Sequence, residues 1–570
     1  MKVKKILRMI LIVSAVMVAA FAVFLYKMNE NSKKLKDEIH KSAEKECGIV
    51  SLQGENYSMN IPSTTEITDL VVAGENVNVL IFEANGAQDI YSTEHTQKIK
   101  QQLERMQLKK EYTFEAPLLA YNPYGTNSCG LYIYFKTEEK TQLEYTVSIP
   151  DENIPDFSRT MKENSLHGKN EYEYLLTGLV PGMENYLRVR LLSDSGKEIK
   201  TMVYRINMPA SPYGNPSAVV CEYVKEKKSI ANGLFYAYGV GTCSIPAYDN
   251  AGYLREEFPL IEENALGIDV AGASMYIQPS DKKIAKLSMT GEVLGVVDVG
   301  EYTITNDVAY NGIGNILALA SKDARKTKGD VIIKINFENA SVEEIIDFRD
   351  KLKGYYKAYA KKEKKTDWLG INDIEVFNKN DLLVSAGGIS SIINVQNVMT
   401  KNPIIKYIIG DEKVWKKAEM TDFLLTRGYE EGEEKEDTGI LEKEVPFEVV
   451  NQTGVVPYMT VDNNNLYDEE GNYVPAPTYY LNTLNNTNGV NEFMRLKIDE
   501  EAKTYMLTNQ VPIENVMNAA SISSIEANIV VNDAAANIIQ EISVDGQAYV
   551  RLNVKALKAE KLSMKDYWFK

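Results

Sequence analysis

The pattern of hydrophobic and polar positions begins with an apolar run at the N-terminus. Residues 9–26 are uncharged and follow four basic residues. An apolar helix of about 18 residues nearly spans a hydrocarbon core of about 30 Å. A cleaved signal peptide is the alternative, with a small-residue site at Ala20-Phe21-Ala22, but its apolar part is usually shorter. We therefore expect residues 1–26 to be an uncleaved anchor with a short basic cytoplasmic tail, residues 6–26 lying in the membrane.

A polar segment follows the apolar run. Residues 27–46 are rich in charged, helix-prone side chains and contain neither Gly nor Pro. This composition is typical of a juxtamembrane stalk, which we extend over residues 27–56. The sequence contains no second apolar run of comparable length, so the remaining body must lie on one side of the membrane. We expect a single-pass cell-membrane protein whose body is extracytoplasmic.

Short alternating strands dominate residues 57–210. β-Branched and aromatic residues alternate with polar ones there, and polar turns separate the segments. One helical pattern, at residues 95–110, interrupts the series. The region is predicted to be an immunoglobulin-like β-sandwich. The clearest predicted strands are 131–137, 143–149, 186–192 and 201–208.

A looser repetition occupies residues 211–570. Segments such as KLSMTGEVLGVVDVG and KINFENASVEEIIDF consist of a strand, a turn with Asn, Asp or Gly, and another strand. They recur at about 40 to 50 residues, which is the period of one four-stranded propeller blade. The length allows about six blades. The predicted fold is therefore all-β, with one transmembrane helix, a sandwich and a six-bladed β-propeller.

The charge balance excludes one class of partner. The chain has 63 Lys or Arg against 80 Asp or Glu and a formal net charge of −17. Because the basic residues are enriched at the N-terminus, the body is more acidic still, and it would repel a polyphosphate. We expect no nucleic-acid partner. The acidic segment at residues 429–439 is interpreted as a solvated insertion, and whether the chain forms a homo-oligomer stays open.

Metal and cofactor signatures are missing. The four cysteines lie at positions 47, 129, 221 and 243 and form no CxxC motif. This spacing argues against a zinc site, and it leaves the disulfide pairing open. In the segment that begins at Asp462, Leu466 stands where a calcium loop needs an oxygen ligand. No nucleotide-binding GxxxxGK[ST] or HExxH motif occurs, and GVGTCS at residues 239–244 lacks the third glycine of a dinucleotide loop. We expect neither a metal nor a cofactor.

Histidine is scarce in this chain. The three histidines are His40, His95 and His167, so the whole C-terminal region lacks imidazole. His40 lies in the polar stalk, His95 at the start of the predicted helix and His167 in a polar loop, and these places are typical of surface residues. A Ser-His-Asp or Cys-His site in the C-terminal region is therefore excluded unless a histidine comes from elsewhere.

Several segments together resemble the bacterial aryl-sulfate sulfotransferases. The N-terminal region contains YNPYGTNSCGLYIYFKTEEKTQLEYTVSI and EYEYLLTGLVPGMENYLRVRLL, and the C-terminal region contains YDNAGYLR, AKLSMTGEV, DWLGINDIEVF, SIINV, KYIIGD and VDNNN in the family's order. The resemblance implies a small N-terminal β domain and a six-bladed propeller. It also implies transfer of a sulfuryl group from a phenolic sulfate to a phenol through a covalent histidine intermediate, without a nucleotide sulfate donor.

The sequence departs from the family at the positions that the resemblance makes catalytic. The family's HHD stretch corresponds to Thr305, Asn306 and Asp307, so both histidines are replaced. The DWxHxNS motif reads DWLGIND, which keeps Asn372 but places Gly370 where histidine belongs. Two of the family's motifs have thus lost their imidazoles.

Two further motifs are changed in the same sense. The SSRxxS motif reads SAGGIS, with Gly387 at the arginine position, and the QH motif reads NQTGVV, with Thr453 at the histidine position. Nucleophilic catalysis needs a group acceptor and donors for the developing oxyanion. Loss of several members of a catalytic unit leaves little beyond binding. We therefore predict a catalytically degenerate protein with no intact catalytic residue.

The seven matched positions are predicted to form a substrate-binding site. They should converge from four blades on the propeller axis, although Asn, Asp, Gly and Thr are also ordinary turn residues, which is the alternative. Because the matched cations are absent, we expect the site to have lost its preference for anions. The ligand is expected to be a small phenolic molecule, a peptide or a cell-wall component. The alternatives are an active aryl-sulfate sulfotransferase with a substitute nucleophile and a purely structural domain.

Overall fold

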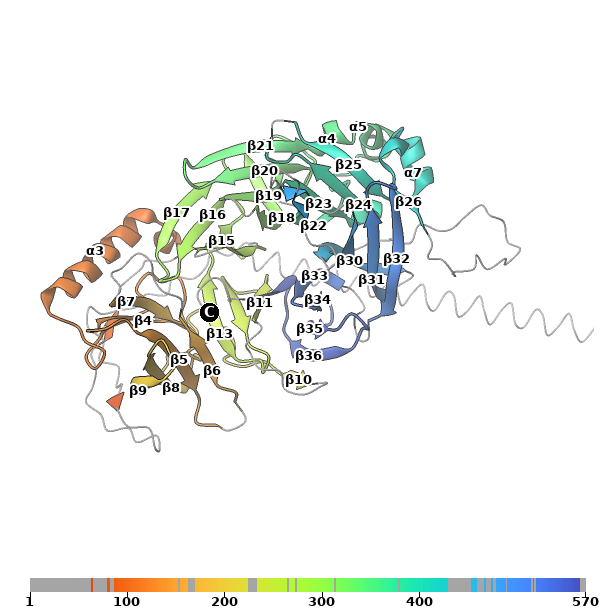
Figure 1. The fold of residues 1–570 in the computed structure, drawn as a ribbon. Coiled ribbons are helices and arrows are strands. Elements are labelled where there is room, and N and C mark those ends of the chain that lie inside the picture. The colour runs from red at the N-terminus through yellow and green to blue at the C-terminus, as the bar shows by residue number, and fades with distance from the viewer. Residues whose placement is uncertain are drawn as a thin grey trace, which may run out of the picture.

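The computed structural model places an N-terminal β-sandwich against a β-propeller (Figure 1). The predicted anchor and stalk, residues 1–56, lie outside the described residues. Among the residues that are described, no helix is long and apolar enough to cross a membrane. The structure describes residues 63–64, 79–81, 87–151, 154–161, 170–223, 233–263, 266–271, 274–311, 314–377, 380–400, 402–428, 453–458, 466–467, 473–474, 478–487, 490–513, 516 and 519–563.

The N-terminal sandwich consists of two facing sheets. Inward and outward residues alternate along its strands, most regularly in β8, because successive side chains of a strand point to opposite faces. The predicted strands and the immunoglobulin-like fold are confirmed, and the predicted helix is α3 (Thr93–Lys109). One sheet contains β1 (Ser63–Thr64), β9 (Glu198–Asn207), β8 (Glu184–Leu192), β5 (Gln142–Ser148) and β6 (Phe157–Thr160), in that order. The other contains β2 (Val79–Ile81), β3 (Leu118–Tyr121), β4 (Leu131–Lys136) and β7 (Glu171–Leu176), with α2 (Ala87–Ile90) preceding α3.

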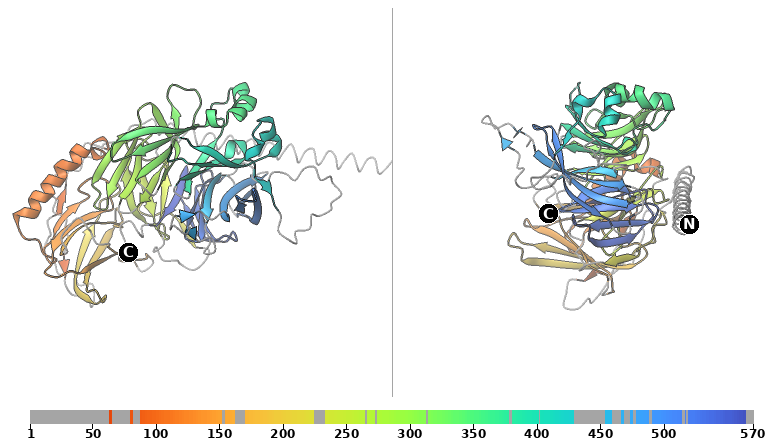
Figure 2. Two further views of the ribbon diagram at one scale, coloured as in Figure 1. Left: turned by 45° about the horizontal axis from the view of Figure 1, so that its top comes forward. Right: turned by 90° about the vertical axis from the view of Figure 1, so that its right-hand side faces the viewer.

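The propeller contains six sheets in the part of the chain that the structure describes. The innermost strands of neighbouring blades contact one another around most of the ring. Figure 2 shows the propeller from two further sides. From the inside outward, blade 1 contains β37 (Lys558–Leu562), β11 (Leu234–Tyr238), β12 (Ser244–Tyr248) and β13 (Leu254–Pro259). Blade 2 contains β14 (Ile268–Ala271), β15 (Ser274–Ser280), β16 (Lys283–Ser288) and β17 (Val293–Asp298). Blade 3 contains β18 (Tyr302–Tyr310), β19 (Asn315–Lys322), β20 (Val331–Asn336) and β21 (Ser341–Asp347).

The remaining blades carry the additional edge strands and helices. Blade 4 contains β22 (Ile371–Phe377), β23 (Asp381–Ala386), β24 (Ser391–Gln396) and β25 (Ile404–Ile409), with η3 (Gly387–Ile389) between two strands. Blade 5 contains β27 (Thr453–Tyr458), β30 (Thr478–Thr487), β31 (Val490–Asp499), β32 (Thr504–Pro512) and the edge strand β26 (Thr426–Arg427); β28 (Leu466–Tyr467) and β29 (Tyr473–Val474) form a separate hairpin. Blade 6 contains β33 (Ala519–Ile525), β34 (Asn528–Asp533), β35 (Ile538–Ile542), β36 (Ala548–Asn553) and the edge strand β10 (Cys221–Tyr223).

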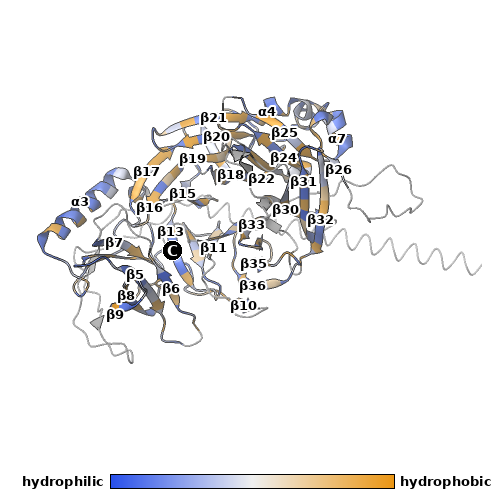
Figure 3. Ribbon diagram, in the orientation of Figure 1, coloured by the Kyte–Doolittle hydropathy of each residue, from blue (hydrophilic) through white to orange (hydrophobic). Residues whose placement is uncertain are grey.

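The two ends of the propeller sequence close the ring twice. The last strand, β37, pairs antiparallel with β11 and becomes the inner strand of blade 1. The first strand, β10, pairs antiparallel with β36 of blade 6. Such closure joins the first and last blades through backbone hydrogen bonds and leaves only short edges. Figure 3 shows that the strand β20 is mostly hydrophobic and that the helices α3 and α7 (Glu412–Lys417) on the outside are mostly hydrophilic.

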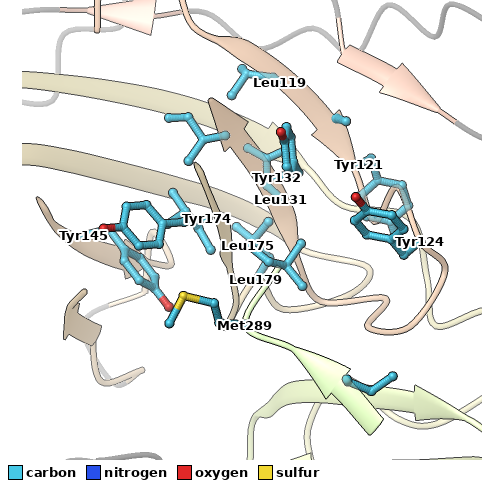
Figure 4. Packing of buried hydrophobic residues seen from close by; sticks show 14 of the residues in the cluster. Leu119, Tyr121, Tyr124, Leu131, Tyr132, Tyr145, Tyr174, Leu175, Leu179 and Met289 are labelled. Atoms are coloured by element: carbon cyan, nitrogen blue, oxygen red, sulfur yellow. The ribbon is translucent and has the colours of Figure 1, made fainter. Parts of the chain in front are cut away.

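One hydrophobic core joins the sandwich to the propeller. Met289, from the turn after β16, belongs to the same buried cluster as Tyr145, Leu175 and Leu179 of the sandwich (Figure 4). Packing of this kind at the contact makes the two bodies one cohesive unit.

A charged tripeptide on β13 lies at the seam between sandwich and propeller. Arg255 forms a fully buried ion pair with Asp249, 2.7 Å from Nε to Oδ2. The guanidinium also donates to the carbonyls of Gly178 and Pro155 in the sandwich, at 3.0 Å each. These contacts give the buried charges of Arg255 and Asp249 partners, which is the condition for tolerating charge in a protein interior.

The two glutamates beside Arg255 are also buried at this seam. Glu257 accepts hydrogen bonds from Ser211 and Asn215, both at 2.6 Å, and from Ser128 of the sandwich. Glu256 accepts one from the Tyr236 hydroxyl at 2.6 Å. Burial raises the pKa of Glu256 from 4.5 to about 7. The seam therefore contains a carboxyl group that titrates near neutral pH.

The raised pKa of Glu256 predicts how the free energy of unfolding changes with pH. The Glu256 carboxyl loses its proton near pH 7 in the native state but near pH 4.5 in the unfolded chain. Its contribution to the free energy of unfolding is therefore fully present below pH 4.5 and is lost as the pH rises towards 7. We expect Glu256→Gln to remove that loss, which amounts to up to about 3 kcal/mol. Urea unfolding between about pH 5 and 8 measures it. The exposed Glu338→Gln is the control, and equal pH slopes for wild type and Glu256→Gln would contradict the assignment.

The cysteines have different states. Cys243 is disulfide-bonded, Cys129 is buried and forms no disulfide, and the Cys221 thiol donates to the Asn250 carbonyl at 3.1 Å. Cys47 lies outside the described residues.

Candidate functional site

Four neighbouring inner strands shift register close to the propeller axis. The shifts fall between Ile304 and Val308 in β18, Ile371 and Asp373 in β22, Thr453 and Val455 in β27, and Ala519 and Ser521 in β33. A β-bulge leaves the extra residues outside the ladder and re-aims their side chains, and bulges are common beside functional sites. The predicted residues Thr305, Asn306 and Asp307 lie in the first of these bulges, and Asn372 lies in the second.

The bulge of blade 3 contacts blade 4 directly. Asn306 has a left-handed backbone with φ of +42°, and its side-chain amide donates to the Ile371 carbonyl at 2.7 Å. The Thr305 hydroxyl donates to the Leu319 carbonyl on the adjacent strand, at 3.4 Å. Asn306 therefore ties two inner strands together at the axis.

The predicted residues of blades 4 and 5 lie next to this contact. Gly370 precedes β22 with φ of +55°, and a Cβ there would lie 2.8 Å from the backbone of Gly388. Gly387 begins η3 beside it, and the side-chain Oδ1 of Asn372 accepts the Gly454 N–H at 3.3 Å. Thr453 is the first residue of β27.

The expectation of four blades is wrong. Gly370, Asn372 and Gly387 all belong to blade 4, because the turn after β23 folds back beside the start of β22. The seven residues therefore come from three consecutive blades. Their role in binding a substrate stays a prediction.

Three aspartates on consecutive inner strands share one structural role. Each accepts a backbone N–H of the next inner strand. Each carboxyl oxygen thereby satisfies a backbone donor of the neighbouring blade, as buried polar groups require. The pairs are Asp269 with Tyr310 at 2.6 Å, Asp307 with Ile374 at 2.8 Å and Asp373 with Val455 at 2.8 Å.

Lys558 is the cation of this region, and sequence reasoning missed it. It begins the last strand, β37, and its ammonium lies 2.5 Å from Asp307 Oδ1 and 2.7 Å from Glu560 Oε1. The side chains of Lys558 and Asp307 are only 8% and 5% exposed. Because 251 positions separate Lys558 from Asp307, only the ring closure brings them together.

The charged residues around Lys558 form a group that we name the axial cluster. Burial alone would lower the pKa of Lys558, but Asp307, Glu560 and Asp373 together raise it well above its ordinary value. Burial and mutual repulsion raise the pKa of Asp373 and Glu375 well above their usual range, and burial raises that of Asp269 to about 7. The cluster comprises Asp269, Asp307, Asp373, Glu375, Lys558 and Glu560.

Part of the axial cluster faces accessible space. Asp269, Glu375 and Glu560 lie on inner strands, deeply enclosed by protein, yet their residues keep partial solvent exposure. Within the described part of the chain, the side-chain carboxyl of Glu375 forms no hydrogen bond or ion pair. An enclosed carboxyl group of this kind can donate or accept a hydrogen bond from a ligand on the axis.

The chemistry available at the axis is limited. Lys558 stays protonated and is held by two carboxylates, so it is a poor nucleophile. No histidine follows position 167 in the sequence. Within the described ranges, no three His, Cys, Asp or Glu side chains are arranged to hold a metal ion. The cluster can bind through hydrogen bonds and charge but contains no evident group acceptor.

Comparison with solved structures gives matches of low similarity. Streptogramin B lyase shares 14% identity over 61% of this chain and 100% of its own, with a TM-score of 0.31. The periplasmic gluconolactonase PpgL of Pseudomonas aeruginosa shares 8% over 74% and 99%, with a TM-score of 0.32, and BamB of Moraxella catarrhalis shares 10% over 59% and 91%, with a TM-score of 0.30. No curated protein matches the chain.

Two protein-family models match the chain in the expected order. The arylsulfotransferase Ig-like domain matches residues 118–209, within the sandwich, and the arylsulfotransferase (ASST) model matches residues 221–560, within the propeller. The second match alone covers more than half of the chain. The chain therefore belongs to the arylsulfotransferase family.

Proposed function

We propose that this protein is a catalytically degenerate arylsulfotransferase that binds a neutral or cationic small molecule at the propeller axis. The family reaction needs a residue that accepts the sulfuryl group, together with cations for the developing negative charge. The matched positions offer Thr305, Asn306, Gly370, Gly387 and Thr453 instead of histidine and arginine. The axial lysine does not replace them, because its charge is already paired.

The composition of the axial cluster carries this proposal. Five carboxyl groups surround one lysine, and burial raises the pKa values of Asp269, Asp373 and Glu375 above their usual range. A sulfate that approached Lys558 would have to displace Asp307 or Glu560 and would face the remaining carboxyl groups. An amine or hydroxyl group would instead supply the partner that Glu375 lacks.

The location of the protein is part of the proposal and rests on the sequence. Residues 6–26 anchor it in the cytoplasmic membrane, residues 27–56 form the stalk, and the body of residues 57–570 lies on the extracytoplasmic side. Within that body, residues 57–210 form the N-terminal domain and residues 211–570 the propeller.

The alternative function is the family's own reaction, transfer of a sulfuryl group from a phenolic sulfate to a phenol. It would require a substitute nucleophile among the matched positions. The Thr305 hydroxyl donates to the Leu319 carbonyl rather than to a general base. A threonine without a base is a weak nucleophile near neutral pH. Degeneracy fits these contacts better.

Calorimetric titration of the full chain in detergent tests the ligand preference. We use tyramine, phenol and phenyl sulfate, which share one ring and differ in charge. Tyramine should bind most tightly and phenyl sulfate most weakly. Glu375→Gln should weaken tyramine binding about tenfold, or about 1.4 kcal/mol, while Glu338→Gln leaves it unchanged. Tighter binding of phenyl sulfate than of tyramine would overturn the proposal.

A further inference from the structure

A basic surface lies on the outer edge of blades 3 and 4, on an otherwise acidic protein. It is formed by residues 325–328, 349–367 and 411–419, which contain fourteen Lys or Arg against six Asp or Glu, whereas the whole chain has a net charge of −17. The lysines of α5 (Lys353–Tyr355), η2 (Tyr356–Ala360) and α6 (Lys361–Glu363) are exposed, as are those of α7. We name residues 325–328, 349–367 and 411–419 together the basic cap.

Specific contacts hold the three segments together. Tyr355 is buried between Trp368 and Trp415, with ring centroids 6.0 and 5.2 Å away. The Tyr359 hydroxyl donates to the Val414 carbonyl at 3.2 Å, which joins η2 to α7. Figure 1 shows α4 (Phe348–Lys351), α5 and α7 gathered at one edge of the propeller. The lysines therefore project from a packed base and not from a loose tail.

Close approach of the backbone fixes this base further. A Cβ at Gly354 would lie 1.9 Å from the Ala418 carbonyl oxygen, so only glycine allows α5 to touch α7. The Lys328 N–H donates to the Thr366 carbonyl at 2.9 Å, which brings the basic loop of blade 3 beside the helices. These contacts place the three charged segments next to one another.

We propose that the basic cap docks on an anionic phospholipid bilayer. Exposed lysines near an anionic membrane are attracted over about a Debye length, so the acidity of more distant parts of the chain is screened. Half-buried tyrosines accompany the lysines, and Lys417 Nζ lies 4.4 Å from the Tyr359 ring centroid. Cationic and aromatic side chains together are typical of surfaces at the headgroup level of a bilayer.

The proposed membrane anchor favours a bilayer over other anions. This step rests on the proposed function, in which residues 6–26 hold the body close to the membrane. Tethering turns a weak surface contact into an intramolecular one with a high effective concentration. An acidic protein or a soluble polyanion would have no such advantage, and each is an outcome that the test below can reveal.

Hydrogen exchange of the full chain in lipid nanodiscs tests the docking. One set of discs contains phosphatidylcholine alone and the other also contains about 30% phosphatidylglycerol. Amides of residues 349–365 and 411–419 should exchange at least about threefold more slowly in the anionic discs, and about 0.5 M salt should abolish the difference. Equal exchange in both discs, with or without protection, would overturn the proposal and would point to a protein or soluble polyanion instead.

Charge-reversal variants assign the effect to the basic cap. Replacing Lys357, Lys361, Lys362 and Lys416 with glutamate should remove the difference between the discs, because all four are exposed. Protection that survives in this variant would contradict the assignment. Tyramine titration, which probes the axis, should give the wild-type result and shows that the variant is folded.

A matched control reverses four lysines elsewhere. Lys98, Lys109, Lys110 and Lys197 are exposed on the sandwich, and the variant with glutamate at these positions should keep the difference between the discs. A chain that fails to copurify with either disc would contradict the anchor. Sedimentation with vesicles of the same two compositions then tests docking alone, and absence of charge-dependent binding overturns it.

Discussion

Replacing Lys558 with methionine should lower the free energy of unfolding by about 3 to 5 kcal/mol, the cost typical of breaking a buried ion pair from one side. Methionine keeps most of the volume of the lysine stem but removes the ammonium group. Asp307 and Glu560 would then lose a partner at 2.5 and 2.7 Å, in a region where like charges already repel. Because Lys558 joins the last strand to blade 3, the variant should also weaken the ring closure.

Urea unfolding of wild type and variants measures this effect. Lys555→Met, three positions earlier and less buried, should change the free energy of unfolding by less than about 1 kcal/mol. The double variant Lys558→Met with Asp307→Asn should recover part of the loss, since it removes one of the charges left without a partner. A loss below about 1 kcal/mol for Lys558→Met would contradict the role that we give to this ion pair.

Local sequence patterns predicted the elements of the fold well. The strands β4, β5, β8 and β9 and the helix α3 follow from alternation and helical spacing, which are set by neighbouring residues. The repeat length predicted the propeller in the same way, because blades 2, 3 and 4 are each one meander of four consecutive strands. The predicted anchor and stalk lie outside the described residues and stay predictions.

The axial cluster could not be predicted in the same way. Asp373 and Glu375 occur in the strand INDIEVF, where nothing local separates an axial carboxyl group from an ordinary surface one. Lys558 becomes an axial residue only because β37 pairs with β11, over 300 positions away in sequence. One signal was available, since a propeller that closes with its last strand places polar residues of that strand near the axis.

The structure also changes the meaning of two predicted residues. Asp307 matches the aspartate of the family's HHD stretch, but its oxygens accept from Ile374, Val308 and Lys558. A structural role accounts for it without a substrate. Gly370 occupies a left-handed turn against Gly388, so a histidine there would strain the backbone. Restoring the family's imidazole would therefore require rearrangement of this turn.

We expect this protein to lack sulfuryl-transfer activity, and this is the largest functional effect that the proposal predicts. Removal of a nucleophile and its helpers commonly lowers kcat by about 10⁴-fold or more. In this chain other residues replace the histidines of three family motifs and the arginine of a fourth. The axial Lys558 is paired with Asp307 and does not replace them. Binding without turnover is the expected result.

A sulfuryl-transfer assay tests the central claim most directly. The full chain is incubated with p-nitrophenyl sulfate and phenol, next to a heat-inactivated sample and a family member that has the histidines. We expect nitrophenol release by this chain to equal that of the heat-inactivated sample, while the histidine-bearing enzyme turns over. Phenol-dependent release of nitrophenol above the heat-inactivated level would show that this protein is an active sulfotransferase and would contradict our account.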